Sequence, residues 1–266
     1  MRGAIIGKDI SYTKSPLLYN KYFNDNSLKG SYEILDFPNL DKLEEFVKSS
    51  EFKKYNFFNI TTPYKEFFVD KIINDDIVVN ESKSLNLLIN DSSGLKGYNT
   101  DAEGFYNAYF EKLVSCNISE ILLVGTGPVA RTVKLYIKQA TAANLSVMSP
   151  RNNKIPDFFS DLVYFHPENT DAPAMCYKFD LMIFAANYKA EKIITEMPLH
   201  VERIINLNYQ SNELKEFAML NRLKYFGGEM MLIEQFKENL KLLNIYNKDY
   251  EFNELLTAMG KVRFKV

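Results

Sequence analysis

The sequence contains few of the residues from which metal sites and histidine-dependent catalytic sites are built. Its 266 residues include two cysteines and two histidines. Cys116 and Cys176 lie far apart and have no metal-ligand spacing. With only His166 and His200 available, a zinc site or a histidine-based triad is not expected either. We therefore expect no metal and a chain that resides in the reducing cytoplasm.

Long apolar runs and an excess of one charge are also missing. No stretch approaches the roughly 18 apolar residues of a membrane span, and the apolar stretch near the N-terminus is too short for a signal peptide. The net charge is −2 with mixed signs throughout, so we expect no nucleic-acid or membrane partner. The 46% of hydrophobic residues suffices for one large or two modest domains.

Strand-like and helix-like segments alternate along most of the chain. Strands are expected over 4–6, 32–37, 57–61, 85–89, 95–98, 120–124, 145–148, 180–185 and 203–207. Helices are expected from Ser15, after a cap at Asn39, over 64–73, after Asp101, and over 128–140, 230–243 and 250–259. Residues 149–178 fit no element. The alternation predicts an α/β fold with a parallel sheet covered by helices on both faces.

A glycine-rich turn follows the strand expected over 120–124. It reads Gly125-Thr126-Gly127-Pro128-Val129-Ala130 and matches the G-x-G-x-x-G/A pattern of dinucleotide-binding turns. Gly125 would permit the tight turn, Gly127 would let the backbone approach a pyrophosphate, and Pro128 suits the first helical position. An ordinary strand-to-helix turn also fits, but the flanking strand and helix favour a dinucleotide site.

The segment after the next strand usually distinguishes NAD from NADP. An acidic residue about 20 positions after the turn would bind the ribose 2′-hydroxyl of NAD. Here no carboxylate occurs before Asp157, whereas Arg151 and Lys154 could meet the 2′-phosphate of NADP. A solvated loop is the alternative interpretation of these cations. The sequence favours NADP and leaves NAD open.

Hydroxyl, amide and charged side chains gather in short segments of the N-terminal part. Ser15, before Pro16, is expected to cap a helix, and a helix N-terminus with the Thr13 and Ser15 hydroxyls nearby would also suit a carboxylate. Lys65 is expected in the first turn of the helix over 64–73, where a cation opposes the helix dipole. Asp101 is expected to cap the helix that follows it.

Several of these polar residues share a position relative to the strands. Asn59 and Thr61 lie at the end of one strand, and Lys65 and Asp101 lie just beyond strand ends. In parallel α/β proteins the carboxyl ends of the strands line the ligand crevice. The pattern therefore predicts that these residues belong to one polar site.

In this order the segments resemble the shikimate dehydrogenase family. That family combines S-x-S-P, N-V-T-x-P-x-K, V-N-T and N-T-D segments with a GxGG turn and an M-L-x-x-Q helix, which correspond here to 13–16, 59–65, 85–87, 99–101, 125–128 and 231–235. The resemblance runs from residue 4 to about residue 240. It implies two domains with a cleft between them. Residues 1–101 and about 237–266 would form an α/β substrate domain with a mainly parallel sheet, and about 102–236 a Rossmann-like NADP-binding domain.

The resemblance also implies an activity, the NADP-dependent reversible reduction of 3-dehydroshikimate to shikimate in aromatic amino acid biosynthesis. Lys65 and Asp101 would form the catalytic dyad, with Lys65 donating a hydrogen bond or proton to the developing alkoxide and Asp101 orienting it. The implied substrate-binding residues are Thr13, Ser15, Asn59, Thr61, Asn86, Tyr209 and Gln235. The implied cofactor-binding residues are Gly125, Thr126, Gly127, Pro128, Val129, Ala130 and Arg151. The chain would act as a monomer or homodimer on small molecules.

The sequence departs from the family pattern mainly in the cofactor half. Thr13 replaces a serine, Pro128 replaces a glycine, and the arginine of the N-R-T segment is displaced to Arg151. The family's N-A-T-S-x-G-M loop corresponds to residues 185–189, which read Ala-Ala-Asn-Tyr-Lys. Two alternatives therefore stay open. One is a relaxed quinate/shikimate dehydrogenase that uses NAD, and the other is a non-catalytic shikimate-binding regulatory protein.

Overall fold

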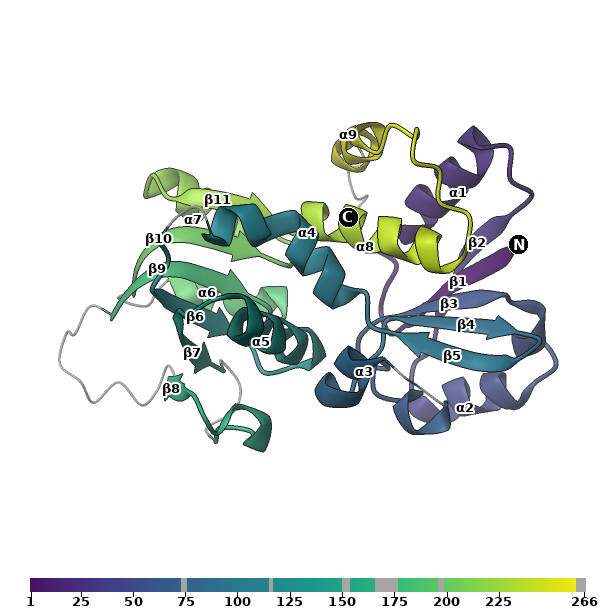
Figure 1. Ribbon diagram of the computed structural model, residues 1–266, viewed down its shortest axis with the longest axis horizontal. Coiled ribbons are helices and arrows are strands. Elements are labelled where there is room, and N and C mark those ends of the chain that lie inside the picture. Colours follow the sequence, from purple (N-terminus) through teal and green to yellow (C-terminus); the bar gives the residue numbers. More distant parts are fainter. Residues whose placement is uncertain (73–75, 115–116, 150–153, 166–176, 196–198, 262–266) are drawn as a thin grey trace. The chain divides into compact units, whose positions relative to one another are not determined.

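The computed structural model describes residues 1–72, 76–114, 117–149, 154–165, 177–195 and 199–261 (Figure 1). The chain divides into two units. Unit 1 consists of Met1–Thr100 and Gln235–Val266, and unit 2 consists of Asp101–Glu234. Strands and helices alternate in both units, which confirms the predicted α/β class.

Unit 1 is built on a five-stranded sheet with the order β2-β1-β3-β4-β5. Its strands are β1 (Arg2–Gly7), β2 (Ser31–Asp36), β3 (Phe57–Ile60), β4 (Leu87–Asp91) and β5 (Gly94–Tyr98). β1 pairs in parallel with β2 and with β3, whereas the β3–β4 and β4–β5 pairs are antiparallel. The two strands expected over 85–89 and 95–98 form an antiparallel hairpin, β4 and β5, which extends a parallel core of three strands.

Unit 1 also contains the helices α1 (Ser15–Asp25), α2 (Leu40–Lys48), α3 (Ile77–Ser82) and α9 (Asn253–Lys261), with short 3-10 turns η1 (Phe52–Lys54) and η2 (Val69–Lys71). Of these helices, α1 and α2 pack on opposite faces of the sheet. Neighbouring residues of β3 point to opposite faces, as the pleat of a strand requires. Phe58 belongs to the apolar cluster that includes Leu43 of α2, whereas the ring of Phe57 lies 5.2 Å from that of Tyr19 of α1.

Unit 2 contains a six-stranded sheet whose pairs are all parallel, in the order β11-β10-β9-β6-β7-β8. The strands are β6 (Glu120–Val124), β7 (Asn144–Met148), β8 (Val163–Phe165), β9 (Tyr177–Phe184), β10 (Leu199–Asn206) and β11 (Lys224–Gly227). The helices are α4 (Asp101–Val114), α5 (Pro128–Ala140), α6 (Glu191–Thr195) and α7 (Glu213–Leu220), with 3-10 turns η3 (Asp157–Phe159) and η4 (Tyr188–Ala190). A further helix, α8 (Glu229–Leu242), begins in unit 2 and ends in unit 1.

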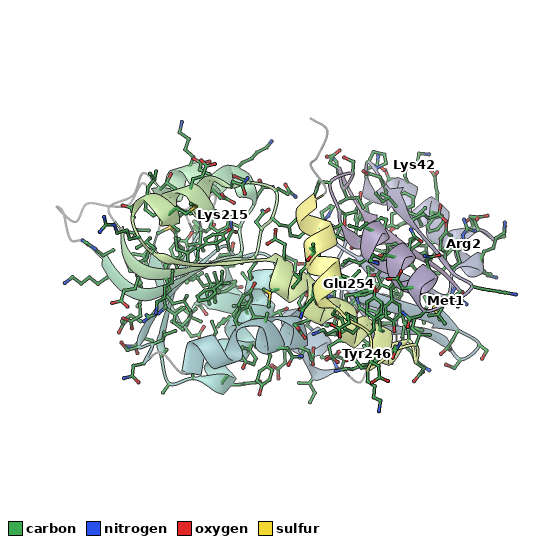
Figure 2. The ribbon with its side chains drawn as sticks, turned by 90° about the horizontal axis from the view of Figure 1, so that it is seen from above. Met1, Arg2, Lys42, Lys215, Tyr246 and Glu254 are labelled. Atoms are coloured by element: carbon green, nitrogen blue, oxygen red, sulfur yellow. The ribbon has the colours of Figure 1, made fainter. Side chains whose placement is uncertain are left out.

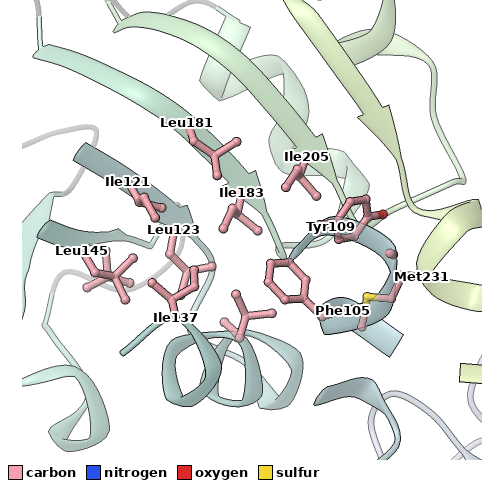
Figure 3. Packing of buried hydrophobic residues seen from close by; sticks show 14 of the residues in the cluster. Phe105, Tyr109, Ile121, Leu123, Ile137, Leu145, Leu181, Ile183, Ile205 and Met231 are labelled. Atoms are coloured by element: carbon pink, nitrogen blue, oxygen red, sulfur yellow. The ribbon is translucent and has the colours of Figure 1, made fainter. Parts of the chain in front are cut away.

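Two apolar clusters lie on the two faces of the six-stranded sheet. Leu123 and Ile183 pack with α4 and α5, and this cluster is drawn in Figure 3. Leu122 and Met182, one position away in each strand, pack instead with α6 and α7. Each fully buried side chain of this size contributes about 1.5–3 kcal/mol. The near-continuous apolar strands are therefore explained by a sheet that is covered on both sides.

The helix expected over residues 64–73 is wrong. The turns here are closed by bonds from each N–H to the carbonyl three residues earlier, from Tyr64 to Thr61, Phe67 to Tyr64, Val69 to Glu66 and Lys71 to Phe68. Tyr64 and Phe68 are buried at a spacing of four residues, which is also typical of one face of a helix. Successive tight turns after Pro63 bury the same side chains without an α-helix.

Charged side chains, among them Lys42 of unit 1 and Lys215 of unit 2, project from the surface (Figure 2). Within the described residues, none of the helices combines the length and apolar character needed to cross a membrane.

Candidate active site

Two hydroxyl groups lie together at the start of α1. Thr13 Oγ1 donates to Ser15 Oγ at 3.3 Å, and the Ser15 N–H donates to Thr13 Oγ1 at 3.4 Å. The prediction that Ser15 caps the helix is wrong by one position, because the N-cap is Lys14 and Ser15 is the first helical residue. The Ser15 hydroxyl is therefore paired with Thr13 rather than with a helical N–H.

The end of β3 carries the first amide of the site. Asn59 Oδ1 accepts a 2.7 Å hydrogen bond from Tyr32 Oη, and Asn59 Nδ2 donates to the carbonyl of Asn86 at 3.3 Å. The next site residue, Thr61, is fixed through its N–H, which donates to the carbonyl of Ile6 at 2.9 Å. β3 and its neighbours thus set the positions of both predicted residues.

Lys65 lies in the turns that follow the cis Thr62–Pro63 bond, and it is 6% exposed. Its carbonyl accepts from the N–H of Leu85 at 2.9 Å, which ties this segment to the chain entering β4. Because no helix forms here, the predicted conflict with a helix dipole does not exist. Burial is unusual for lysine, but Lys14 and Lys134 are buried to a similar extent. What makes Lys65 a functional candidate is its burial together with its position just beyond the end of β3.

The second amide of the site, Asn86, pairs with Thr100. The Thr100 N–H donates to Asn86 Oδ1 at 2.8 Å, and Asn86 Nδ2 donates to Thr100 Oγ1 at 3.1 Å. Both residues are buried. Asp101, 2% exposed, follows as the first residue of α4, one position inside the predicted cap. A carboxylate in a first helical turn is favoured by the helix dipole.

The remaining predicted substrate residues are half-buried. Gln235 lies on α8. Tyr209 lies in the segment after β10, where two consecutive asparagine turns shape the backbone. In these turns the Asn208 N–H donates to Asn206 Oδ1 at 3.0 Å and the Gln210 N–H donates to Asn208 Oδ1 at 2.9 Å.

The glycine-rich turn follows β6 as predicted, and its two glycines are required for different reasons. Gly125 has a φ of +118°, and a Cβ there would lie 2.7 Å from the carbonyl oxygen of Ala185. Its N–H donates to the carbonyl of Met148 at 2.7 Å. Gly127 is exposed, and a Cβ on it would meet nothing within 4 Å. Gly125 is therefore needed to make the turn, whereas Gly127 leaves open space beside the start of α5.

This open space fits the pyrophosphate of a dinucleotide. Gly127 is the N-cap of α5 and makes no side-chain capping bond, and Pro128 is the first helical residue. Because the Arg131 N–H already donates to the Gly127 carbonyl, the N–H groups without an acceptor in the helix are those of Val129 and Ala130. Such groups at a helix N-terminus bind phosphate oxygens. Arg151, predicted to meet the 2′-phosphate, lies outside the described residues.

A buried carboxylate that the sequence did not reveal joins the end of β10 to the start of α7. Glu191 is 0% exposed and accepts from Asn206 Nδ2 at 3.1 Å and from the Leu214 N–H at 3.0 Å. It follows the altered 185–189 loop, in which the Lys189 N–H donates to Asn187 Oδ1 at 3.0 Å. Nothing in the sequence distinguishes Glu191 from an exposed glutamate, because its partners come from distant segments.

The site residues supply hydroxyls, amides, one buried ammonium and one buried carboxylate. Among the described residues, no group of three or more His, Cys, Asp or Glu side chains is arranged to hold a metal ion. The donor set suits a small acid that carries several hydroxyls, and the glycine-rich turn suits a dinucleotide.

Comparison with known proteins gives consistent results. A family model for the shikimate dehydrogenase substrate binding domain matches residues 5–76. A shikimate dehydrogenase (NADP(+)) of Clostridium perfringens is 29% identical over 98% of both chains. Shikimate dehydrogenase 1 of Peptoclostridium difficile superposes with a TM-score of 0.81 at 16% identity, over 98% of both chains. Shikimate 5-dehydrogenase of Thermus thermophilus, solved with NADP(H) and shikimate, superposes with a TM-score of 0.77 at 21% identity, over 98% of this chain and 99% of that one.

The two structural comparisons show that the fold is shared. The sequence comparisons add that the similarity extends to the residues themselves. The family model covers the segments that hold Thr13, Ser15, Asn59 and Lys65, and the curated relative covers both units. The chain is thus similar to shikimate dehydrogenases in sequence over both units, and its residues 5–76 match their substrate binding domain.

Proposed function

We propose that this protein catalyses the reversible, NADP-dependent reduction of 3-dehydroshikimate to shikimate. The observation that carries the proposal is the buried Lys65, which follows the Asn59–Thr61 strand end inside the segment matched by the substrate-domain model. A curated relative over the full length is named shikimate dehydrogenase (NADP(+)), and a solved protein of the same fold holds NADP(H) and shikimate.

Unit 1 binds the substrate. The paired hydroxyls of Thr13 and Ser15 bind its carboxylate, because hydroxyl donors at a helix N-terminus stabilise an anion. The resemblance assigns Tyr209 to the same carboxylate. The ring hydroxyls are bound by the remaining site residues, namely Asn59, Thr61, Asn86 and Gln235. A site built to bond hydroxyl groups discriminates strongly against analogues that lack them.

Unit 2 binds the cofactor. The backbone around Gly127 and the N–H groups of Val129 and Ala130 hold the pyrophosphate, and Arg151 contributes to the recognition of the 2′-phosphate. When bound, the nicotinamide supplies the hydride that reduces the ketone. Gly125 has a structural role, because it brings the turn against Ala185 at the start of the altered loop.

Lys65 and Asp101 act on the oxygen at the reacting carbon. As the ketone is reduced, the Lys65 ammonium donates a hydrogen bond and then a proton to the developing alkoxide. In the reverse direction the neutral amine accepts that proton. Asp101 orients the lysine and accepts from a ring hydroxyl. General acid–base assistance of this kind contributes typically about 10²- to 10⁴-fold to the rate.

The proposal is tested by following the absorbance of NADPH in the presence of 3-dehydroshikimate. We expect the wild type to oxidise NADPH and Lys65→Ala to do so about 10²- to 10⁴-fold more slowly. Lys71→Ala, which removes an exposed lysine of the same segment, should keep the wild-type rate.

Each other outcome identifies the part of the proposal that fails. Wild-type protein that binds shikimate but oxidises neither NADPH nor NADH would be a binding protein rather than an enzyme. Faster turnover of quinate with NAD than of shikimate with NADP would indicate the quinate alternative. A Lys65→Ala variant with full activity would overturn the role of Lys65 alone.

A further inference from the structure

A chain of hydrogen bonds crosses the interior of unit 1 and includes both amides assigned to the ring hydroxyls. It runs from Tyr32 of β2 through Asn59, Asn86 and Thr100 to Asn239 of α8. Its last bond, from Thr100 Oγ1 to Asn239 Oδ1, is 2.9 Å long. Tyr32 is 4% exposed and Asn239 is also 4% exposed. Buried polar groups are costly unless satisfied, so the direction of each bond matters.

The direction of the first bonds follows from the backbone carbonyl of Asn86. A carbonyl oxygen only accepts, so the Asn59 atom beside it must be the amide nitrogen. The Asn59 oxygen then faces Tyr32, and the phenol must donate to it. With its oxygen engaged in this way, Asn59 offers a ligand an N–H donor.

The direction of the later bonds follows from the backbone N–H of Thr100. An N–H only donates, so it must face the Asn86 amide oxygen. Asn86 Nδ2 then donates to Thr100 Oγ1, which passes its own proton to Asn239 Oδ1 at 2.9 Å rather than to Asn86 Oδ1 at 3.2 Å. Asn239 therefore supplies the acceptor that completes this end of the chain.

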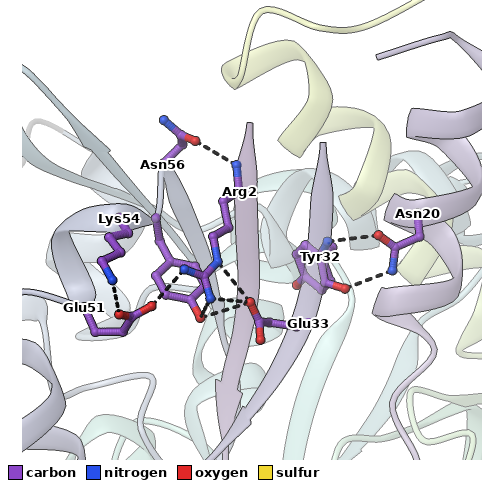
Figure 4. Close-up of polar contacts among 8 residues, drawn as sticks. Arg2, Asn20, Tyr32, Glu33, Glu51, Lys54 and Asn56 are labelled. Carbon is purple, nitrogen blue, oxygen red and sulfur yellow. Dashed lines mark hydrogen bonds and ion pairs between the residues drawn. The ribbon is translucent and has the colours of Figure 1, made fainter. Parts of the chain in front are cut away.

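Tyr32 is itself held firmly. The side chain of Asn20 on α1 accepts from the Tyr32 N–H at 2.9 Å and donates to the Tyr32 carbonyl at 2.8 Å (Figure 4). The Tyr32 ring stacks on that of Tyr19, with centroids 4.1 Å apart and planes 7° from parallel. The hydrogen bonds from Asn20 to the Tyr32 backbone and the stacking on Tyr19 thus hold Tyr32 in place. None of these contacts involves the Tyr32 hydroxyl, which faces Asn59.

We propose that Tyr32 and Asn239 are positioning residues that fix the amides of Asn59 and Asn86 in the orientation that recognises the ring hydroxyls. The nitrogen and oxygen of an amide have nearly the same shape, so only such bonds decide whether a donor or an acceptor faces the ligand. This inference rests on the proposed function, which assigns the two amides to those hydroxyls.

The test is shikimate binding measured by titration calorimetry on the full chain. Tyr32→Phe removes the hydroxyl and keeps the ring stack, and we expect it to raise the dissociation constant of shikimate about fivefold, the effect of one net hydrogen bond. Asn239→Leu should have a smaller effect, because Thr100 Oγ1 can donate to Asn86 Oδ1 instead. In steady state the KM for shikimate should rise with little change in kcat or in the KM for NADP.

The matched control is Tyr55→Phe. Tyr55 is a buried tyrosine of the same unit whose hydroxyl donates to Glu33 and accepts from Arg2, away from the amide chain. The Tyr55→Phe variant should lose about as much thermal stability as Tyr32→Phe, but it should bind shikimate with wild-type affinity. Equal weakening in both variants would overturn the inference, because it would reflect a general loss of stability.

A double-mutant cycle separates positioning from a direct contact with the ligand. In an Asn59→Ala background, Tyr32→Phe should cause no further loss of affinity, since its effect passes through Asn59. An unchanged fivefold loss in that background would overturn the inference while leaving the proposed function intact. Wild-type protein that does not bind shikimate would instead overturn the proposed function, and the inference with it.

Discussion

At the residue scale, the two glycines of the turn after β6 show how one sequence motif contains two physical requirements. Gly125 has a positive φ and approaches the backbone of Ala185, so it is required for folding of the turn. Gly127 has neither constraint. Its missing Cβ matters for the space beside the start of α5, where we propose that the pyrophosphate binds. The motif predicts both glycines, but only the structure separates their roles.

These roles lead to different outcomes for the same substitution. Gly125→Ala should destabilise the protein by about 1–3 kcal/mol, because alanine is strained at that φ and its Cβ would collide with a backbone carbonyl. Gly127→Ala should unfold like the wild type and raise the KM for NADP at least about tenfold, because its methyl group would occupy the pyrophosphate position. Thermal unfolding and steady-state kinetics of both variants test this pair, and a wild-type KM in Gly127→Ala would contradict the cofactor assignment.

The residues found from the sequence differ from those missed in how far away their partners lie. Asn59, Thr61 and Lys65 stand in one short segment whose spacing can be read directly. Tyr32 is hydrogen-bonded to Asn59, which lies 27 residues away in the sequence, and Glu191 is hydrogen-bonded to Leu214, which lies 23 residues away. Contacts at such separations depend on sheet order and register, which no local pattern encodes.

At the element scale, long periodic segments were predicted well and short ones poorly. The predicted bounds of β6 and α5 match the structure, and Asn39 caps α2 through a 3.0 Å bond to the Lys42 N–H. α3, α6 and α7 were missed, because a helix of one or two turns shows little periodicity. Tertiary packing stabilises such short elements more than their own propensity does.

One element-scale prediction concerns the start of β6. Asp180 of β9 accepts from the Ser119 N–H, the Glu120 N–H and the Ser119 hydroxyl at 2.7, 3.0 and 2.8 Å. These bonds stabilise the charged carboxylate and lower the pKa of Asp180, with the Ser119 N–H as the largest cause. Asp180→Ala should therefore lower the free energy of unfolding at neutral pH by about 1–3 kcal/mol.

The pH dependence of that loss follows from the direction of the pKa shift. The pKa of Asp180 in the folded state lies below the unfolded value of about 3.9, so its stabilisation is complete above that pH. It is lost as the pH falls through the folded pKa. Urea unfolding should thus show a smaller difference between wild type and Asp180→Ala at pH ~3 than at pH ~7. A difference that is constant with pH would contradict the role of the charge, and Asp157→Ala, an exposed aspartate of unit 2, is the control.

At the scale of the whole molecule, the fold class of both units follows from the sequence pattern. Strands that alternate with helices give the parallel sheet of unit 2, and the hairpin gives the antiparallel pairs of unit 1. The helix wrongly expected over 64–73 did not change this result, because the turns bury Tyr64 and Phe68 all the same. The pattern of buried residues is thus more robust than the backbone conformation that connects them.

The two units contain the groups for two different ligands. Unit 1 contains the hydroxyl and amide groups suited to a polyol acid, and unit 2 contains the turn suited to a dinucleotide. Neither ligand alone produces a reaction, so activity requires both units. Transfer of an isotope label from the cofactor to the substrate therefore shows that both ligands are bound and react.

Hydride transfer is followed with NADPH in which both hydrogens on the reactive carbon of the nicotinamide are replaced by deuterium. Purified protein is incubated with this cofactor and 3-dehydroshikimate, and the product is examined by mass spectrometry and NMR. We expect shikimate with deuterium on the carbon that bore the ketone, and a greatly reduced yield with Lys65→Ala. Shikimate without the label, or no shikimate at all, would contradict the proposed function.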